Sequence, residues 1–133
     1  MIIEIAGMPP SVNHTYVTTR SGRRVRLREA EYYQAKVGWE TIVAKNANAW
    51  SWDGGHLRIT VKLYPPDRRR RDTHNYLKVL LDGVADGLGV DDKWFLVHEE
   101  PPELDKANPR VAVTVDALKV ALREAGLPVV KEA

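Results

Sequence analysis

One segment in the middle of the chain combines side chains that bind phosphate with side chains that bind metal ions: RRRRDTHNYLK, residues 68–78. Each arginine presents a planar fork of donors that matches the edge of a phosphate group. The carboxylates of Asp72 and of the later pair Asp91-Asp92 would repel phosphate on their own. They are, however, the hard oxygen ligands that Mg²⁺ and Mn²⁺ prefer. The combination therefore predicts metal-assisted phosphodiester chemistry on a nucleic acid.

Each of these residues also has a simpler interpretation. Asp72 precedes an apolar helical pattern, so it can cap a helix as well as bind a metal. The Asp91-Asp92 pair can be a solvated turn, although a compact return from helix to strand could bring it to the same sheet edge as Asp72. His74 is either a metal ligand or an ordinary polar residue at a helix start. Lys78 either lies near a bound phosphate or forms a surface ion pair with Asp82, one helical turn away.

The whole-chain composition restricts the class of protein. The 133 residues are expected to form one domain, with its core over about residues 1–116 and a C-terminal helix and tail over 117–133. The net charge is only +2, so a DNA-binding surface must come from local clustering of arginines. Without cysteine there are no disulfides or thiolate metal sites. We find no signal peptide and no apolar segment of ~18 residues, so we expect a cytoplasmic protein that does not bind membranes.

The order of apolar patterns predicts an α+β fold. Strands are expected over residues 2–6, 16–19, 24–27, 56–64, 94–98 and 110–115, and helices over 29–49, from 72 or 73 to about 88, and over 117–125. Strict alternation marks 56–64 as a strand with one buried face, and Ser21-Gly22 marks a tight hairpin. Together these elements predict a two-layer α/β sandwich with a small mixed sheet and two main helices.

Some residues of these elements have specific expected places. In the first helix we expect Tyr33, Val37, Ile42 and Val43 to point inward, and Asp53-Gly54-Gly55 to break the helix. Asp116 is expected to cap the last helix. The tryptophans are most simply core or interface residues, namely Trp39, Trp50, Trp52 and Trp94. Trp50 and Trp52 could instead stack on unpaired bases, but we favour the core.

Three segments resemble a known family, the RusA-type Holliday junction resolvases: RRRDTHNYLK at 69–78, LDGV at 81–84 and VDD at 90–92. The early PPSVNHTY at 9–16 is similar to that family's N-terminal motif. The resemblance runs from about residue 8 to residue 115. It implies a homodimeric α+β endonuclease that acts in DNA recombination and repair. Such an enzyme binds four-way junction DNA and cuts it with the help of Mg²⁺ or Mn²⁺.

The resemblance also implies roles for individual residues. Asp72 and Asp92 correspond to catalytic metal-binding aspartates, Asp91 to a neighbouring acidic residue, and Lys78 to a lysine important for catalysis. The family's usual motif has a second aspartate where this chain has His74, so His74 joins the expected metal ligands. The residues expected to contact DNA are Arg68, Arg69, Arg70, Arg71, Asn75, Asn13, Arg23 and Arg24.

The histidine also leaves other functions open. Imidazole suits Mn²⁺ better than Mg²⁺, so His74 could accompany an impaired metal site. The main alternative is therefore a non-catalytic protein that binds branched DNA. An RNA-directed hydrolase or a toxin-like nuclease with a similar acidic cluster is a third possibility.

Overall fold

A computed structural model describes residues 1–10, 16–26, 28–69 and 76–128. In order, the elements are β1 (Ile2–Ala6), β2 (Tyr16–Thr18), β3 (Arg24–Arg26), α1 (Arg28–Ala47), β4 (Leu57–Tyr64), α2 (Leu77–Leu88), a 3₁₀ turn (Asp92–Trp94), β5 (Phe95–Glu99), β6 (Arg110–Ala117) and α3 (Leu118–Glu124). None of the helices in these ranges is long and apolar enough to cross a membrane.

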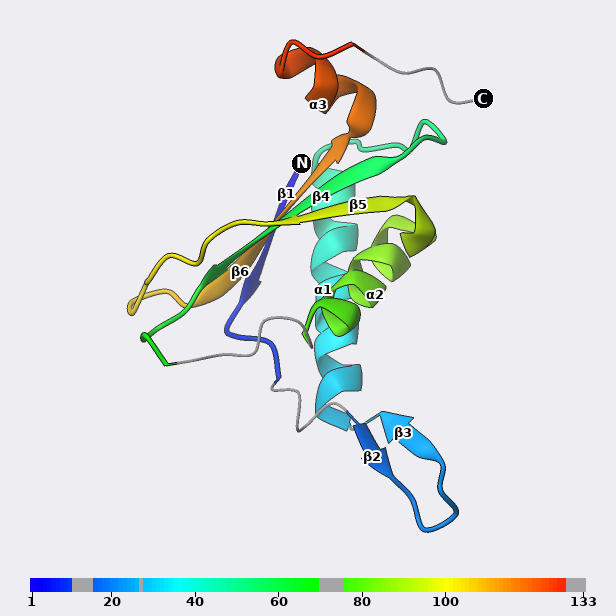
Figure 1. Ribbon diagram of the computed structural model, residues 1–133, viewed down its shortest axis with the longest axis vertical. Helices are drawn as coiled ribbons and strands as arrows, with labels where there is room; N and C mark the ends of the chain where they lie inside the picture. The colour runs from blue at the N-terminus through cyan, green and yellow to red at the C-terminus, as the bar shows by residue number, and fades with distance from the viewer. Residues whose placement is uncertain (11–15, 27, 70–75, 129–133) are drawn as a thin grey trace.

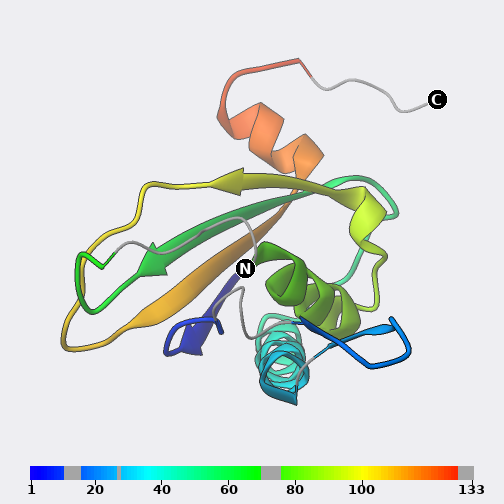
Figure 2. The ribbon, with the colours of Figure 1, turned by 60° about the horizontal axis from the view of Figure 1, so that its bottom comes forward.

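Four strands form one mixed sheet in the order β1-β6-β4-β5. The β1–β6 and β6–β4 pairs are antiparallel, and the β4–β5 pair is parallel. Helices α1 and α2 lie together on one face of this sheet (Figures 1 and 2). The structure therefore confirms the expected α+β sandwich of two layers, with a mixed sheet and two main helices.

The parallel pair is joined by α2, so β4, α2 and β5 form one β-α-β unit. In such a unit, the loop before the helix lies at the C-terminal ends of the parallel strands, and the loop after the helix lies at their N-terminal ends. The arginine-rich segment enters α2, and Asp91-Asp92 leave it. The described residues on either side of the arginine-rich segment, Arg69 and Tyr76, are thus separated from Asp91-Asp92 by the length of the unit.

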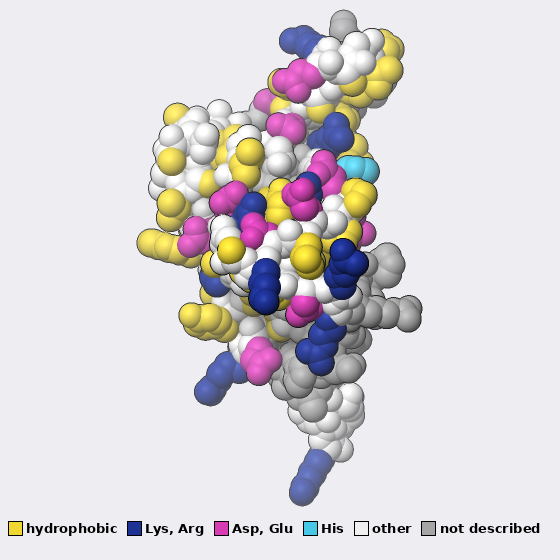
Figure 3. All heavy atoms as spheres, turned by 90° about the vertical axis from the view of Figure 1, so that its left-hand side faces the viewer, with side chains coloured by type: hydrophobic (Ala, Val, Ile, Leu, Met, Phe, Trp, Pro, Cys, Tyr) yellow, Lys and Arg dark blue, Asp and Glu magenta, His cyan; other side chains and the backbone are white. Residues whose placement is uncertain are grey.

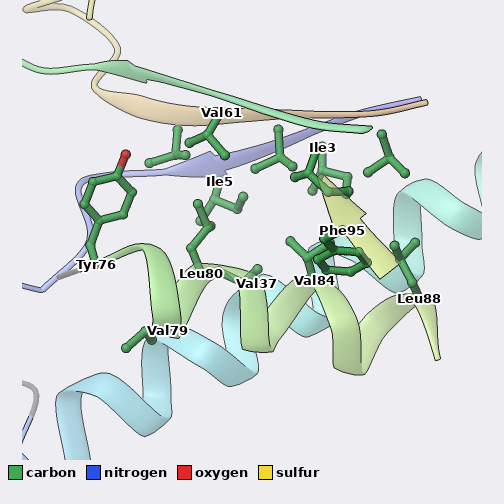
Figure 4. Close-up of a cluster of buried hydrophobic side chains, with 14 of the residues drawn as sticks. Ile3, Ile5, Val37, Val61, Tyr76, Val79, Leu80, Val84, Leu88 and Phe95 are labelled. Atoms are coloured by element: carbon green, nitrogen blue, oxygen red, sulfur yellow. The ribbon is translucent and has the colours of Figure 1, made fainter. Parts of the chain in front are cut away.

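The core lies between the sheet and the two helices (Figure 4). Ile3 and Ile5 from β1 and Val61 from β4 meet Leu80 and Val84 from α2, and all five are at most 1% exposed. Alternation along β4 buries every second residue, as the sequence predicted. In α2, Leu80, Val84 and Leu88 are buried, whereas Leu77 and Leu81 pack at the edge of the core.

Helices α1 and α2 run in the same direction and touch through glycines. A β-carbon added at Gly83 would lie 2.7 Å from the β-carbon of Val37 and 2.8 Å from the carbonyl oxygen of Gln34. One added at Gly87 would lie 2.5 Å from the β-carbon of Thr41. Real β-carbons do not approach other atoms so closely, so only glycine permits this contact between the helices.

This contact explains why two expected inward positions of α1 are wrong. Ile42 is 40% exposed and Val43 is 46% exposed. The face of α1 that meets the rest of the molecule instead carries Ala30, Tyr33, Val37, Gly38 and Thr41, all buried. Successive helical residues are rotated by about 100°, so positions 42 and 43 point away from that face. Trp39, at 65% exposure, is likewise a surface residue and not part of the core.

Two expected helix boundaries also differ, and a third lies outside the described residues. Helix α1 ends at Ala47, where Trp50 N–H donates to the Lys45 carbonyl and Ala49 has φ 48°, before Asp53-Gly54-Gly55 is reached. Asp116 does not cap α3, because β6 continues to Ala117 and pairs Asp116 with Arg58 of β4. Helix α2 begins at Leu77 in the described residues, and the expected start at 72 or 73 lies outside them.

The expected hairpin between β2 and β3 is confirmed. Gly22, at φ 83°, closes a turn in which Gly22 N–H donates to the Thr19 carbonyl and Thr19 N–H to the Arg23 carbonyl. A glycine in this left-handed conformation is typical of three-residue hairpin loops. The hairpin projects beyond the N-terminal end of α1 (Figure 1), and its turn exposes Arg20 and Arg23.

We expect Gly83→Ala to destabilise the protein by up to about 2 kcal/mol. The added methyl group overpacks the helix contact, which costs about 1–3 kcal/mol, whereas the gain in helix propensity is about 1 kcal/mol. Gly38→Ala is the matched control, because a β-carbon there would have its nearest neighbour at an ordinary 3.5 Å. This control should be neutral or stabilising. Equal denaturation midpoints for the two variants would contradict the proposed close contact.

Candidate functional site

The Asp91-Asp92 pair lies in a tight turn that is built by the end of α2. Gly89, at φ 70°, ends the helix in a left-handed conformation, and the N–H groups of Gly89 and Val90 both donate to the Ala85 carbonyl. Val90 then enters the core, at 4% exposure. The Asp91 carboxylate accepts a hydrogen bond of 3.0 Å from Lys93 N–H and so caps the Asp92–Trp94 turn. The backbone of Asp92 is thus fixed within this turn, and its side chain is exposed.

A cleft of about 460 Å³ opens beside this turn and is lined largely by acidic side chains. Its lining residues are Gln34, Asp82, Ala85, Asp86, Gly89, Val90, Asp91 and Asp92. Gln34 donates a hydrogen bond of 2.8 Å to Asp86, and Lys45 donates one of 3.2 Å to the Leu88 carbonyl, so both tie α1 to the end of α2. The cleft therefore gathers four carboxylates at the C-terminal end of α2.

Two of the polar residues in this cleft were missed by the sequence analysis. Lys78, Asp82 and Asp86 follow one another at four-residue spacing, so they share one face of α2. That spacing was the available signal for Asp86. Gln34 belongs to a different helix, and nothing in the local sequence connects it to Asp91 or Asp92.

Lys78 lies in the first turn of α2, away from Asp92. Its side chain is 67% exposed, and its ammonium group lies 3.8 Å from the Asp82 carboxylate, which confirms the expected ion pair. Such an exposed pair contributes little to stability. Because α2 rises by about 1.5 Å per residue, its 12 residues place Lys78 about 16 Å from the Asp91-Asp92 turn along the helix axis.

The described part of the arginine segment lies at the far end of the β-α-β unit as well. Arg68 and Arg69 follow the C-terminal end of β4 and are exposed, and Arg69 N–H donates to the Asp67 carboxylate at 2.9 Å. The Asp92–Trp94 turn leads into Phe95, which pairs with Leu57 at the other end of β4. The eight residues of β4 span about 26 Å.

The sequence suggested that Asp72 and Asp92 could lie at the same sheet edge of one chain. Asp72 itself lies outside the described residues, but the residues that flank its segment lie far from Asp92. Both described neighbours of the motif, Arg69 and Tyr76, lie at the opposite end of the β-α-β unit from Asp92. The other predicted site residues lie outside the described residues: Asn13, Arg70, Arg71, Asp72, His74 and Asn75. Arg23 is exposed in the β2–β3 turn, and Arg24 belongs to β3.

Tyr76 anchors the end of the motif to the core. It is 6% exposed, and its hydroxyl donates to the Glu99 carboxylate of β5 at 3.5 Å. Burial, together with the charge of Glu99, raises the pKa of Tyr76 well above its usual range. The phenol of Tyr76 therefore stays neutral and fixes the start of α2 to the sheet.

Tyr33 of α1 is buried as well, and its hydroxyl has no partner among the described residues.

Two other cations of the described surface, Arg110 and Lys62, have internal partners. Arg110 pairs with Asp105 at 2.7 Å and lies over the Tyr64 ring at 3.8 Å, and its hydrogen bond lowers the pKa of Asp105. Lys62 pairs with Glu103 at 3.4 Å. On the face shown in Figure 3, Lys and Arg side chains are interspersed with Asp and Glu. The described residues of that face therefore carry charges of both signs and do not form a uniformly basic surface.

The capacity of the described residues to bind a metal is limited. Among residues 1–10, 16–26, 28–69 and 76–128, no three His, Asp or Glu side chains stand close enough together to hold a metal ion. The oxygens of Asp91 and Asp92 suit a hard divalent cation. By themselves, however, they do not complete its coordination.

Residues 6–116 match the family described as endodeoxyribonuclease RusA. The matched range includes both the arginine-rich segment and the Asp91-Asp92 turn. The chain therefore belongs to the RusA endodeoxyribonuclease family, as its motifs indicated.

A curated relative from Xylella fastidiosa (strain Temecula1), described as an uncharacterized protein, is 30% identical over 90 residues. The similarity covers 61% of this chain and 57% of that protein.

We expect Asp91 to act mainly as a cap that holds Asp92 in place. Asp91→Asn keeps an oxygen that accepts from Lys93 N–H, so it should preserve stability and most of the activity of the site. Asp91→Ala removes the cap and should cost about 1 kcal/mol of stability as well as activity. Thermal unfolding and DNA cleavage assays on both variants test this. Equal loss of activity in the two variants would instead assign Asp91 a charge-dependent role, such as metal binding.

Proposed function

We propose that this protein is a structure-selective DNA endonuclease that resolves four-way (Holliday) junctions in DNA recombination and repair. It would hydrolyse the phosphodiester bond with the help of Mg²⁺ or Mn²⁺. The observation that carries this proposal is the family match, which spans both acidic motifs. The carboxylate-lined cleft at Asp91 and Asp92 supports it, because a divalent cation needs such oxygen ligands.

In this proposal Asp72, Asp92 and His74 hold the metal, and Asp91, which caps the Asp92–Trp94 turn, positions Asp92 for it. A bound divalent cation would supply Lewis-acid stabilisation of the charge on the scissile phosphate and help to activate water. Lys78 would stabilise the same developing charge with its ammonium group. The arginines at 68–71 and in the hairpin would hold backbone phosphates without reading the base sequence.

We further propose that the active protein is a homodimer in which two copies complete each site. In the sequence, Asp72 comes before α2, whereas Asp92 comes after it, and Tyr76 and Asp92 lie at opposite ends of this helix. A two-fold partner can place its own Asp72 beside the Asp92 of the first copy. The two resulting sites would face a branched DNA of matching symmetry, which permits paired cuts.

Replacing Asp92 with asparagine tests the proposed site. The substitution removes the charge of a metal ligand but keeps the side-chain size, so cleavage of a synthetic four-way junction should fall by at least about 100-fold. Junction binding should survive. Asp116→Asn is the matched control, because Asp116 lies in β6 and does not line the cleft. Cleavage of junctions by Asp92→Asn at the wild-type rate would refute the assignment.

Mixing two inactive variants tests the shared site. If each site takes Asp72 from one copy and Asp92 from the other, an Asp72→Asn/Asp92→Asn heterodimer contains one intact site. The mixture should then nick one strand of the junction, although each variant alone is inactive. If both aspartates came from the same copy, the mixture would stay inactive, and the proposal of a shared site would be rejected.

His74 favours a second candidate function, a branched-DNA-binding protein without cleavage activity. Imidazole binds metal only when deprotonated and ordinarily titrates near pH ~6.5. If the protein does cleave, we expect more activity with Mn²⁺ than with Mg²⁺ and a loss of activity as the pH falls through that region. His74→Asp should improve the use of Mg²⁺ and move this loss to lower pH. Identical metal and pH profiles for the two proteins would show that His74 takes no part in metal binding.

A further inference from the structure

An aromatic cluster lies directly beside Asp92. The Trp94 ring meets the Trp52 ring edge to face, with centroids 5.7 Å apart and planes at 61°. The His56 ring lies 5.1 Å from Trp94, and the Lys93 ammonium lies 5.7 Å from the Trp94 centroid. Trp94 and Asp92 belong to the same 3₁₀ turn. The cluster is therefore fixed to the segment that carries the candidate catalytic carboxylate.

The Trp52 ring is ordered although it lies on an exposed loop. Its Nε1–H donates to the Gly55 carbonyl at 2.8 Å, and Gly55 N–H donates to the Asp53 carboxylate at 2.9 Å. Residues 51–54 are all exposed, and Trp52 itself is 37% exposed. A large ring that is both held in place and partly exposed can bind a flat partner at a low cost in side-chain entropy.

We propose that the Trp52–Trp94 pair is a stacking platform for an unpaired DNA base next to the strand held at Asp92. This inference rests on the proposed function and adds the part of the substrate that is recognised. Aromatic rings beside cations are the usual means of binding unpaired nucleotides, because every base offers a flat face and every nucleotide carries a phosphate. Lys93 supplies such a cation beside Trp94.

The chemistry of the cluster favours a nucleobase over an apolar protein partner. The exposed apolar side chains on α1, Trp39, Ile42 and Val43, offer a different kind of surface. At the platform, by contrast, the rings of Trp52, Trp94 and His56 lie beside the Lys93 ammonium group and the turn that carries Asp92. The nearby carboxylates repel a bare phosphate, so the divalent cation of the proposed function would help to bring the strand onto the platform.

An abasic-site scan of the junction tests the platform. The Asp92→Asn protein, which should bind without cutting, is titrated with junctions that lack one base at each branch-point position in turn. We expect one position at which the missing base weakens binding by about ten-fold. Adding Trp52→Ala should weaken binding of the intact junction to a similar extent and abolish the effect of that missing base. Trp52→Phe should retain most of the affinity for the intact junction.

Two controls separate stacking from a structural role. Trp39→Ala removes a more exposed tryptophan from α1 and should leave the abasic profile unchanged. Trp52→Ala should keep its thermal unfolding midpoint within a few degrees and its affinity for fully paired duplex DNA. The platform would be overturned if, at every junction position, the loss of binding caused by Trp52→Ala and the loss caused by the missing base simply added to each other. Because binding is measured, this result is distinct from a failure of the wild-type protein to cut junctions, which would refute the proposed function alone.

Discussion

The contact between α1 and α2 through Gly83 and Gly87 determines where the functional parts of this protein lie. The glycines of α2 let its backbone lie directly against side chains of α1. The C-terminal half of α2 therefore packs against Gln34, Thr41 and Lys45 of α1. The Asp91-Asp92 turn leaves α2 at that end, so its position follows from this helix packing. Gln34 of α1 lines the acidic cleft together with the last two turns of α2 and the Asp91-Asp92 turn.

The sequence predicted α2 better than α1, and the reason is physical. Helix α2 has one apolar face, so the spacing of Leu80, Val84 and Leu88 identified its buried side. Helix α1 carries apolar residues on two faces, since Val37 is buried whereas Trp39, Ile42 and Val43 are exposed. What selects the buried face is the fit of Val37 and Thr41 against two glycines of another helix. Hydrophobicity along one helix does not contain that information.

The candidate site was predictable in its chemistry but not in its geometry. The residue types at 68–78 and 91–92 indicated phosphate and metal binding, and the family match agrees with them. The sequence predicted that the two segments flank a helix, but it did not reveal that this helix joins the parallel strands β4 and β5, which puts Arg69 and Tyr76 at the opposite end of the β-α-β unit from Asp92. Likewise, the neighbourhood of Trp52 and Asp92 arises from loops at the N-terminal ends of β4 and β5, which are separated in sequence by all of α2.

The pairing of β1 with β6 also has a consequence for how the protein folds during synthesis. Ile2 lies opposite Thr114, so β1 cannot join the sheet until the residues of β6, more than 100 positions later, have left the ribosome. Strand β6 stands between β1 and β4, so one hydrogen-bonding backbone edge of each of these strands lacks its partner until then. Such long-range pairing slows folding and exposes strand edges in the meantime. We expect chains truncated before Arg110 to aggregate rather than to fold as a smaller domain.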